Sequence, residues 1–196
     1  MKNVSLKERI EQFSRQKTKG KPASGFAHFQ RIFKSAKKIL EFEGLNYDAK
    51  VLHAACYLHD IGEGDRHQEK SANQAAIFLR KISFPLEKIE KVRHAVLEHI
   101  PEGKPKSNDA IALHDADLLD FLGATGVTRL SYATSGWFKK ITLRDTLSIL
   151  KQYRRKAFEN LVLDTSKRLA EEKIRFMDLA IETLEKELKM GCFGIS

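Results

Sequence analysis

Histidine and aspartate gather in one part of this 196-residue chain, where they could hold a metal ion. All seven histidines fall between residues 28 and 114, and none occurs in the last 82 residues. Histidine has no advantage as a helix former that would explain this distribution. Because imidazole is the commonest nitrogen ligand of transition metals, the clustering indicates metal chemistry.

The pair His59-Asp60 is placed to reach an ion at the end of a helix. Apolar Tyr57 and Leu58 precede the pair, and Gly62 follows it closely. Adjacent helical side chains diverge by about 100°, so both can reach one ion only beyond the helix end. A buried carboxylate beside an imidazole also needs a cation or a hydrogen-bonded partner to offset its desolvation. Taken alone, the pair is better explained by a structural His–Asp hydrogen bond.

Two further stretches contribute polar residues to the same set. His28 and Arg31 lie three residues apart, hence on one face of a helix, where a ligand and a phosphate-binding guanidinium would point the same way. Asp115 and Asp117 lie roughly 200° apart around a helix, so only one can face a given ion. Acidic residues are unusual on a helix that is otherwise apolar and belongs only to the core.

The elements that must position these residues are predicted to be helices. Apolar residues recur mostly at intervals of three and four, and strict alternation is nowhere sustained. Ser24 and Asp48 are predicted N-caps, Gly44 and Gly62 mark helix ends, and Pro85 opens a helix. Further helices are predicted around residues 6–13, 71–82, 109–122, 127–134, 143–162 and 166–188, the last capped by Thr165 or Ser166. The chain is therefore predicted to be all-α.

Composition excludes several classes of protein. Hydrophobic residues make up 42% and charged residues 31% of the chain, which is typical of a globular protein and not of a disordered one. No apolar run approaches the roughly 18 residues of a membrane span, and the N-terminus lacks a secretory apolar core. The two cysteines, Cys56 and Cys192, make no disulfide framework. We therefore expect a cytoplasmic protein with no membrane partner.

The net charge of +9 is concentrated near the N-terminus. Residues 1–50 contain twelve Lys and Arg against five Asp and Glu, centred on Lys17, Lys19, Lys21, Lys34, Lys37 and Lys38. Such an end could attract nucleic acid or another phosphate-rich partner. Because no aromatic stacking residues are interleaved, a solvated lysine face is the favoured interpretation.

The order His28, His59-Asp60, Asp117 resembles the HD-domain superfamily of metal-dependent phosphohydrolases. The flanking sequences HFQR, AACYLHDIG and LHDADLLDFLGATGVTR agree with this resemblance. The segment YRRKAFENLVLDTSKRLAEEKIRFMDLAIETLEKE is similar to the C-terminal helical hairpin of the small stand-alone branch. The resemblance covers residues from about 24 to 188 and implies an HD-domain helical bundle with a C-terminal helical extension. We expect three segments: a basic helix and loop (1–23), the metal-binding core (24–135) and C-terminal helices packing on the core (136–196).

The resemblance also implies which residues bind metal. One divalent ion would be held by His28, His59, Asp60 and Asp117, the last chosen over Asp115 because the family ligand follows Ala in an Ala-Asp pair. A second ion in some relatives uses extra histidines, whose places are matched by His67 and His99. The alternative is that His67 lies on the surface and His99 at a helix end. His53 and His114 are interpreted as structural or supporting residues.

Catalytic and substrate-binding roles follow from the same resemblance. Asp60 and Glu63 are the implied catalytic residues, Glu63 orienting or deprotonating the attacking water with a suitable pKa if it is partly desolvated. The predicted substrate-binding residues are Arg31, Arg66, Lys70 and Arg129. Of these, Arg129 matches the family's Gly-(x)n-Arg ending, whereas the others are chosen for their proximity to the motifs.

The implied activity is metal-dependent hydrolysis of a small phosphorylated metabolite, with a nucleotide favoured. A histidine-rich shell favours manganese, iron, nickel or cobalt over magnesium, which prefers oxygen octahedra, and over zinc, which usually takes four ligands. Two other functions stay open. One is a helical nucleic-acid-binding or regulatory module that uses the basic N-terminus. The other is an HD-type di-iron oxygenase, for which the sequence offers no organic-alcohol pocket.

Overall fold

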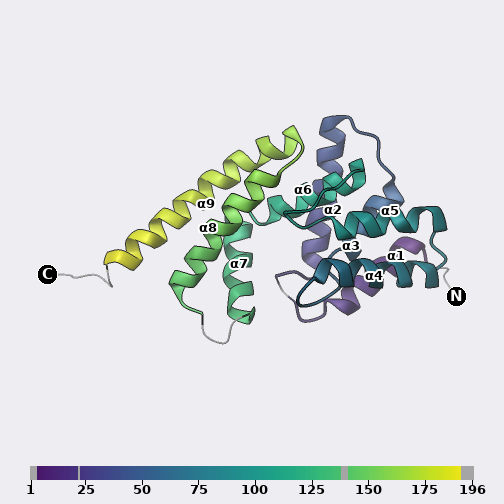
Figure 1. Ribbon diagram of the computed structural model, residues 1–196, viewed down its shortest axis with the longest axis horizontal. Coiled ribbons are helices and arrows are strands. Elements are labelled where there is room, and N and C mark those ends of the chain that lie inside the picture. The colour runs from purple at the N-terminus through teal and green to yellow at the C-terminus, as the bar shows by residue number, and fades with distance from the viewer. Residues whose placement is uncertain (1–3, 22, 138–140, 191–196) are drawn as a thin grey trace. The chain divides into compact units, whose positions relative to one another are not determined.

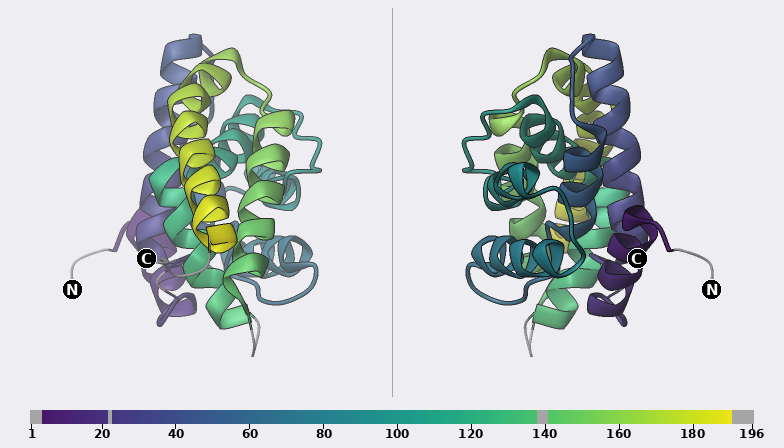
Figure 2. Two further views of the ribbon diagram at one scale, coloured as in Figure 1. Left: turned by 90° about the vertical axis from the view of Figure 1, so that its left-hand side faces the viewer. Right: turned by 90° about the vertical axis from the view of Figure 1, so that its right-hand side faces the viewer.

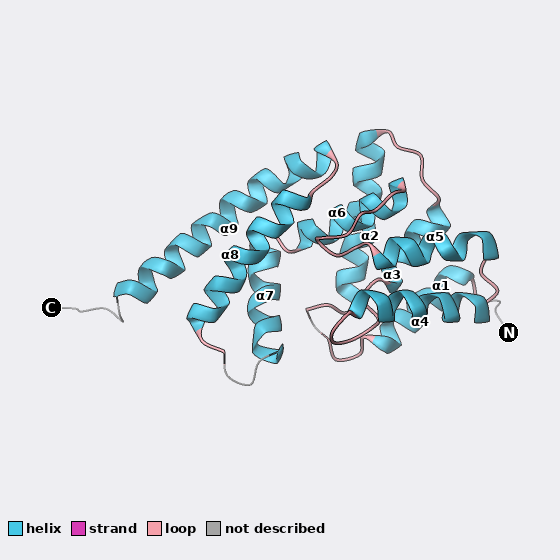
Figure 3. Ribbon diagram, viewed as in Figure 1, coloured by secondary structure: helices cyan, strands magenta, loops and turns pink. Residues whose placement is uncertain are grey.

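The computed structural model describes residues 4–21, 23–137 and 141–190, and helices dominate it (Figure 1). Within these ranges the secondary structure consists of helices joined by loops and turns, without a strand (Figure 3). The predicted all-α fold is confirmed. None of the described helices combines the length and the apolar character needed to cross a bilayer. Cys192 lies outside the described residues.

The chain forms two compact units, of which the first ends at Asp117 and the second begins at Leu118. The first unit holds five complete helices and most of a sixth. These are α1 (Leu6–Lys17), α2 (Phe26–Glu43), α3 (Ala49–Leu58), α4 (His67–Lys81), α5 (Leu86–Leu97) and α6 (Asn108–Asp120). The expected segments 1–23, 24–135 and 136–196 stay predictions.

Helix α3 forms the centre of the first unit. It packs against α1, α2, α4 and α5, and every residue from Val51 to Leu58 is buried. Figure 2 shows α2 as one uninterrupted helix, and its Phe29, Ile32 and Ile39 are fully buried. Because α3 is buried on all sides from Val51 onward, a polar residue at its C-terminal end enters the interior directly.

Local chemistry explains most of the helix ends that position the site. The Asp48 carboxylate accepts hydrogen bonds from the backbone N–H groups of Lys50 (2.9 Å) and Val51 (3.2 Å), so the predicted cap of α3 is confirmed. Gly44 ends α2 as predicted, in the left-handed conformation with a φ of 65°. The N-cap of α2 is Gly25, which makes the prediction of Ser24 wrong.

Three other boundaries differ from the sequence prediction. Helix α3 ends at Leu58, before Gly62, and α4 begins at His67, four residues before the expected Ser71. Arg66, with a left-handed φ of 54°, separates the intervening turn from α4. Helix α9 begins at Asp164, so Thr165 and Ser166 lie in its first turn and do not cap it.

The second unit consists of the end of α6 and the helices α7 (Gly123–Trp137), α8 (Leu143–Asn160) and α9 (Asp164–Met190). Helix α9 packs against both α7 and α8, and α8 and α9 run antiparallel in Figure 1. Arg154 joins α8 to α9 through two hydrogen bonds to Asp178, of 2.8 and 2.7 Å. A Lys151–Glu185 ion pair links the same two helices.

Candidate metal centre

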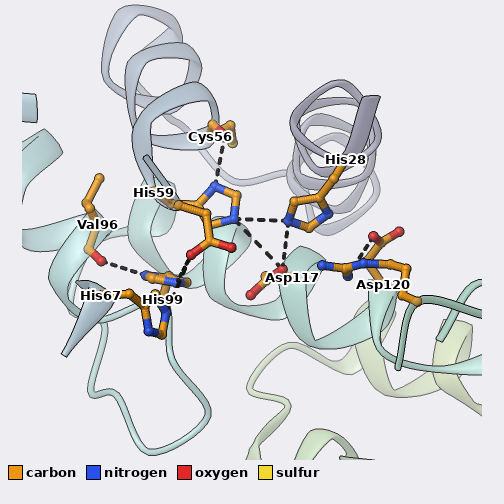
Figure 4. A network of polar contacts seen from close by, with 10 residues as sticks. His28, Cys56, His59, His67, Val96, His99, Asp117 and Asp120 are labelled. Carbon is orange, nitrogen blue, oxygen red and sulfur yellow. Dashed lines mark hydrogen bonds and ion pairs between the residues drawn. The ribbon is translucent and has the colours of Figure 1, made fainter. Parts of the chain in front are cut away.

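Ends and turns of helices bring together, in the first unit, a set of side chains that could bind a metal ion (Figure 4). His28 lies in the first turn of α2, and His59-Asp60 follows the last residue of α3. His67 is the first residue of α4, and His99 lies two residues beyond α5. Asp117 projects from α6 toward His59 and His99, and one ligand atom of each lies within 4.8 Å of those of the other two.

The innermost contacts join His28, His59 and Asp117. The Nε2 atoms of His28 and His59 lie 3.2 Å apart. Asp117 Oδ1 lies 3.3 Å from Nε2 of His28 and 3.9 Å from Nε2 of His59. All three side chains are buried. Three potential ligand atoms therefore converge on one point that is shielded from solvent.

Asp60 extends this group toward two further histidines. Its Oδ1 lies 3.5 Å from Nε2 of His67 and 3.8 Å from Nε2 of His99. Ligand atoms of His28, His59 and Asp60 lie within 4.8 Å of one another, and so do those of Asp60, His67 and His99. Asp60 is thus shared by two overlapping groups. His67, whose side chain is 40% exposed, lies on the solvent side of the cluster.

Backbone carbonyls fix how two of the imidazoles present their ring nitrogens. Nδ1 of His59 lies 2.9 Å from the carbonyl oxygen of Cys56, and Nδ1 of His99 lies 2.6 Å from that of Val96. A carbonyl oxygen can only accept, so each Nδ1 carries a proton and each ring turns its Nε2 toward the cluster. This tautomer is the one that metal-ligating histidines use when a second group orients them.

Burial and neighbouring charges shift the pKa values of several side chains in the cluster. Burial and the nearby His99 lower the pKa of His59 to about 4, and burial also lowers the pKa of His67. Burial alone would raise the pKa of Asp117, but the facing His28 and His59 hold it far below its usual range. The pKa of Asp60 is likewise lowered by the surrounding histidines against the effect of burial. Near neutral pH the site thus offers the neutral imidazoles of His59 and His67 and the ionised carboxylates of Asp60 and Asp117.

The residues fit a divalent metal ion. Asp117 Oδ1 is buried and has no well-aligned hydrogen-bond donor among the described residues, although His28 Nε2 approaches it. A buried, ionised oxygen in that state is costly unless a cation is present. The mixed nitrogen and carboxylate donor set suits a transition metal. Asp115, the alternative acid, instead lies 3.0 Å from Nδ1 of its neighbour His114, and both are buried.

The predicted base, Glu63, lies in the turn that follows Asp60. Its side chain is 72% exposed and forms an ion pair of 2.7 Å with Lys21. The hydrogen bond from Lys21 lowers the pKa of Glu63, and this outweighs the effect of desolvation, which would raise it. Its catalytic role stays a prediction.

The predicted substrate-binding residues lie in different surroundings. Arg66 is exposed and pairs with Glu69 at 3.4 Å, and Lys70 donates a 3.0 Å hydrogen bond to the carbonyl oxygen of Glu63. Arg31 is half-buried on α2, one turn after His28. Arg129, in the second unit, is buried, donates to Asp120 Oδ2 at 2.8 Å and lies over the ring of Phe121. Their binding of substrate stays a prediction.

Sequence reasoning missed two kinds of contact. The carbonyls that orient His59 and His99 belong to residues three positions earlier, Cys56 and Val96. This spacing, common to two histidines at helix ends, is a signal that could have been noticed. Nothing in the sequence near Lys21 or Glu63 indicated that these two residues would pair. His53, interpreted as structural, contacts Glu11 at 2.9 Å, outside the cluster.

Comparison with known proteins identifies the segment that carries these ligands. The HD domain family matches residues 25–122, half of the chain. A comparison with curated proteins gives no match.

Solved structures of similar fold cover nearly the whole chain. A protein from Lactobacillus plantarum has a TM-score of 0.80 at 19% identity, over 97% of this chain and 100% of its own. Bacillus subtilis YpgQ in complex with ADP has a TM-score of 0.68 at 22% identity, over 92% and 97%. An HD-superfamily hydrolase from Bacillus thuringiensis has a TM-score of 0.69 at 22% identity, over 94% and 97%. At these identities the likeness establishes the fold.

Proposed function

Because this chain belongs to the HD-domain superfamily of metal-dependent phosphohydrolases, we propose that it hydrolyses a small phosphorylated metabolite, with nucleotides the favoured class. The observation that carries the proposal is the buried convergence of His28, His59 and Asp117, with Asp60 beside them. Such a set of converging imidazoles and carboxylates supports metal chemistry better than a plain core would.

The metal would be held by the residues already described. His28, His59, Asp60 and Asp117 would bind the first ion, and Asp60 would share a second with His67 and His99. When bound, a divalent ion lowers the pKa of its water toward neutrality and balances charge on phosphate oxygens. The histidine-rich donor set favours manganese, iron, nickel or cobalt over magnesium or zinc.

Residues around the cluster would complete the reaction. Glu63, three positions after Asp60, would accept or orient the proton of the attacking water. Cationic side chains would bind the phosphate groups of the substrate through charge-assisted hydrogen bonds; the candidates are Arg31, Arg66, Lys70 and Arg129. The ADP bound by Bacillus subtilis YpgQ, a protein of similar fold, supports a nucleotide as the substrate class.

The test compares the wild-type chain with Asp60→Ala. We expect the wild type to copurify with a transition metal and to hydrolyse members of a nucleotide panel with added Mn²⁺. Asp60→Ala should lose at least about 100-fold in turnover, because even residues that only support metal ligands cost 10- to 100-fold. The matched control is Asp65→Ala, an exposed acid in the same turn, which should behave as wild type.

Other results would point elsewhere. A folded, metal-loaded chain without turnover on any phosphate ester would contradict the proposal. Salt-sensitive RNA or DNA binding that Asp60→Ala leaves unchanged would favour the nucleic-acid module. Oxygen uptake by anaerobically purified, iron-loaded protein would favour the oxygenase.

A further inference from the structure

We propose that Lys21, in the loop between α1 and α2, is a positioning residue of the candidate active site that holds the Glu63 carboxylate in its working orientation. The inference rests on the proposed hydrolase function and adds a residue from the basic N-terminal stretch to it.

The contact between Lys21 and Glu63 is short and asymmetric. Lys21 Nζ lies 2.7 Å from Glu63 Oε1, which is the length of a charge-assisted hydrogen bond. The lysine side chain is only 25% exposed, whereas that of Glu63 is 72% exposed. An exposed glutamate that lacks packing around it samples many rotamers. The direction of this carboxylate is therefore set by Lys21.

The backbone that carries Glu63 is fixed independently of Lys21. The N–H of Gly62 donates a 2.9 Å hydrogen bond to Oγ of Ser71, which is fully buried. A Cβ atom on Gly62 would lie 2.8 Å from the His67 carbonyl oxygen, so the turn packs tightly on the start of α4. Lys70 Nζ donates to the carbonyl oxygen of Glu63 at 3.0 Å. These contacts hold the main chain, whereas the side chain of Glu63 is held by Lys21.

Lys21 is itself held in place by the backbone that leads into α2. Its N–H donates to the carbonyl oxygen of Thr18 at 3.1 Å. A Cβ atom on Gly25 would lie 2.2 Å from the Lys21 carbonyl oxygen, so only glycine allows this close approach. Gly25 is the N-cap of α2, and His28 follows three residues later. One short stretch of chain thus places both Lys21 and the ligand His28.

Charges around the carboxylate agree with this assignment. The hydrogen bond and charge of Lys21 lower the pKa of Glu63, and the more distant Lys17 adds to the effect. In the same turn, Arg66 pairs with Glu69 at 3.4 Å, and Asp65 is exposed. Glu63 is therefore ionised at neutral pH and able to accept a proton. Loss of Lys21 should raise its pKa and release its side chain.

The experiment measures kcat and KM against pH, with Mn²⁺ and a nucleotide that the wild type hydrolyses. Lys21→Ala should lower kcat about 10-fold, a fraction of the 10²- to 10⁴-fold that a general base contributes. It should move the acid limb of the pH profile to higher pH and leave KM and metal content near wild type. Lys21→Arg should restore the profile. Lys19→Ala, which removes an exposed lysine from the same loop, is the matched control.

A second comparison separates positioning from a structural effect. In a Glu63→Gln background, Lys21→Met should cause no further loss of kcat, because the carboxylate that it would position is already gone. Independent, additive losses would overturn the proposal. An unchanged acid limb in Lys21→Ala, or a raised KM as its main effect, would also overturn it. A metal-loaded wild type without any turnover would instead overturn the proposed function, and this inference with it.

Discussion

At the scale of single residues, the site combines polar groups whose burial costs free energy of desolvation. His59 is fully buried, and Asp117 carries an ionised carboxylate with little access to water. Hydrogen bonds from Nδ1 to backbone carbonyls satisfy one side of the His59 and His99 rings. The other side of each ring faces the cluster, where a cation would supply the missing partner. A bound metal ion would therefore complete the polar contacts of these residues.

The protonation of His59 predicts how the metal-free chain responds to acid. Burial first, and then His99, lower its pKa from 6.5 to about 4 in the folded state. Between these pH values the unfolded chain binds more protons, so the free energy of unfolding should fall as pH drops from about 6.5 to 4. The contribution of His59 is about 3 kcal/mol. Urea denaturation in EDTA at pH 7 and pH 4.5 measures it.

His59→Gln is the control for that measurement. It removes the titrating ring, so the free energy of unfolding should depend less on pH. The pKa values of His53 and His67 are also lowered, so these residues affect stability in the same direction. Some pH dependence of the free energy of unfolding should therefore remain in His59→Gln. The Asp117 carboxyl titrates below this window. Equal stability of the wild type at the two pH values would contradict the prediction.

At the scale of elements, helix ends position most of the candidate ligands. His59-Asp60 follows α3, His67 starts α4, His99 follows α5, and His28 lies in the first turn of α2. Side chains at helix ends can converge from several directions, which adjacent positions within one helix cannot do. The turn between α3 and α4 is the critical element because it connects Asp60, Glu63 and His67. Its geometry depends on the close packing of Gly62 against α4.

Gly62→Ala tests the importance of this turn. The added Cβ would lie 2.8 Å from both the His67 carbonyl oxygen and the Ser71 nitrogen, so the turn must shift. We expect the free energy of unfolding to fall by about 1–3 kcal/mol, as for other overpacked sites. Mn²⁺ affinity, measured by calorimetry, should fall as well. Asn73→Ala on the exposed side of α4 should change neither quantity, and a Gly62→Ala chain with wild-type affinity would refute the argument.

At the scale of the whole molecule, the ligands are unevenly distributed. Every residue of the candidate metal centre lies in the first unit, up to Asp117, whereas α7, α8 and α9 belong to the second. Binding to the folded state stabilises it by about 2.7 kcal/mol when the free ligand is at 100 times its Kd. Metal should therefore suppress local opening chiefly where the ligands are held.

Hydrogen exchange with Mn²⁺ or with EDTA measures this distribution. Amides near residues 28, 59–67, 99 and 117 should exchange more slowly with metal, since opening there breaks the site. Amides in the α8–α9 hairpin, which contributes no ligand to the cluster, should change little. Removal of metal should reverse the protection. Equal protection of both units would show that metal acts on the chain as a whole.

Most of the helices and the composition of the cluster could be predicted from the sequence. Apolar periodicity and caps such as Asp48 are local, so they indicated helices that the structure contains. The candidate ligands could also be recognised from their residue types. The order His28, His59-Asp60, Asp117 therefore indicated a metal site and the family. Less predictable were the boundaries near Ser24, Ser71 and Ser166, where turn geometry outweighs capping preference.

Only the tertiary structure decided how the distant stretches meet. It set Asp60 between two groups of histidines, turned Nε2 of His59 and His99 toward the cluster, and paired Lys21 with Glu63 across 42 positions. Such contacts depend on where folded elements touch, and the energy that selects them comes from packing the entire unit. A residue type can show that a side chain is able to bind or donate, but its partner is chosen by the fold.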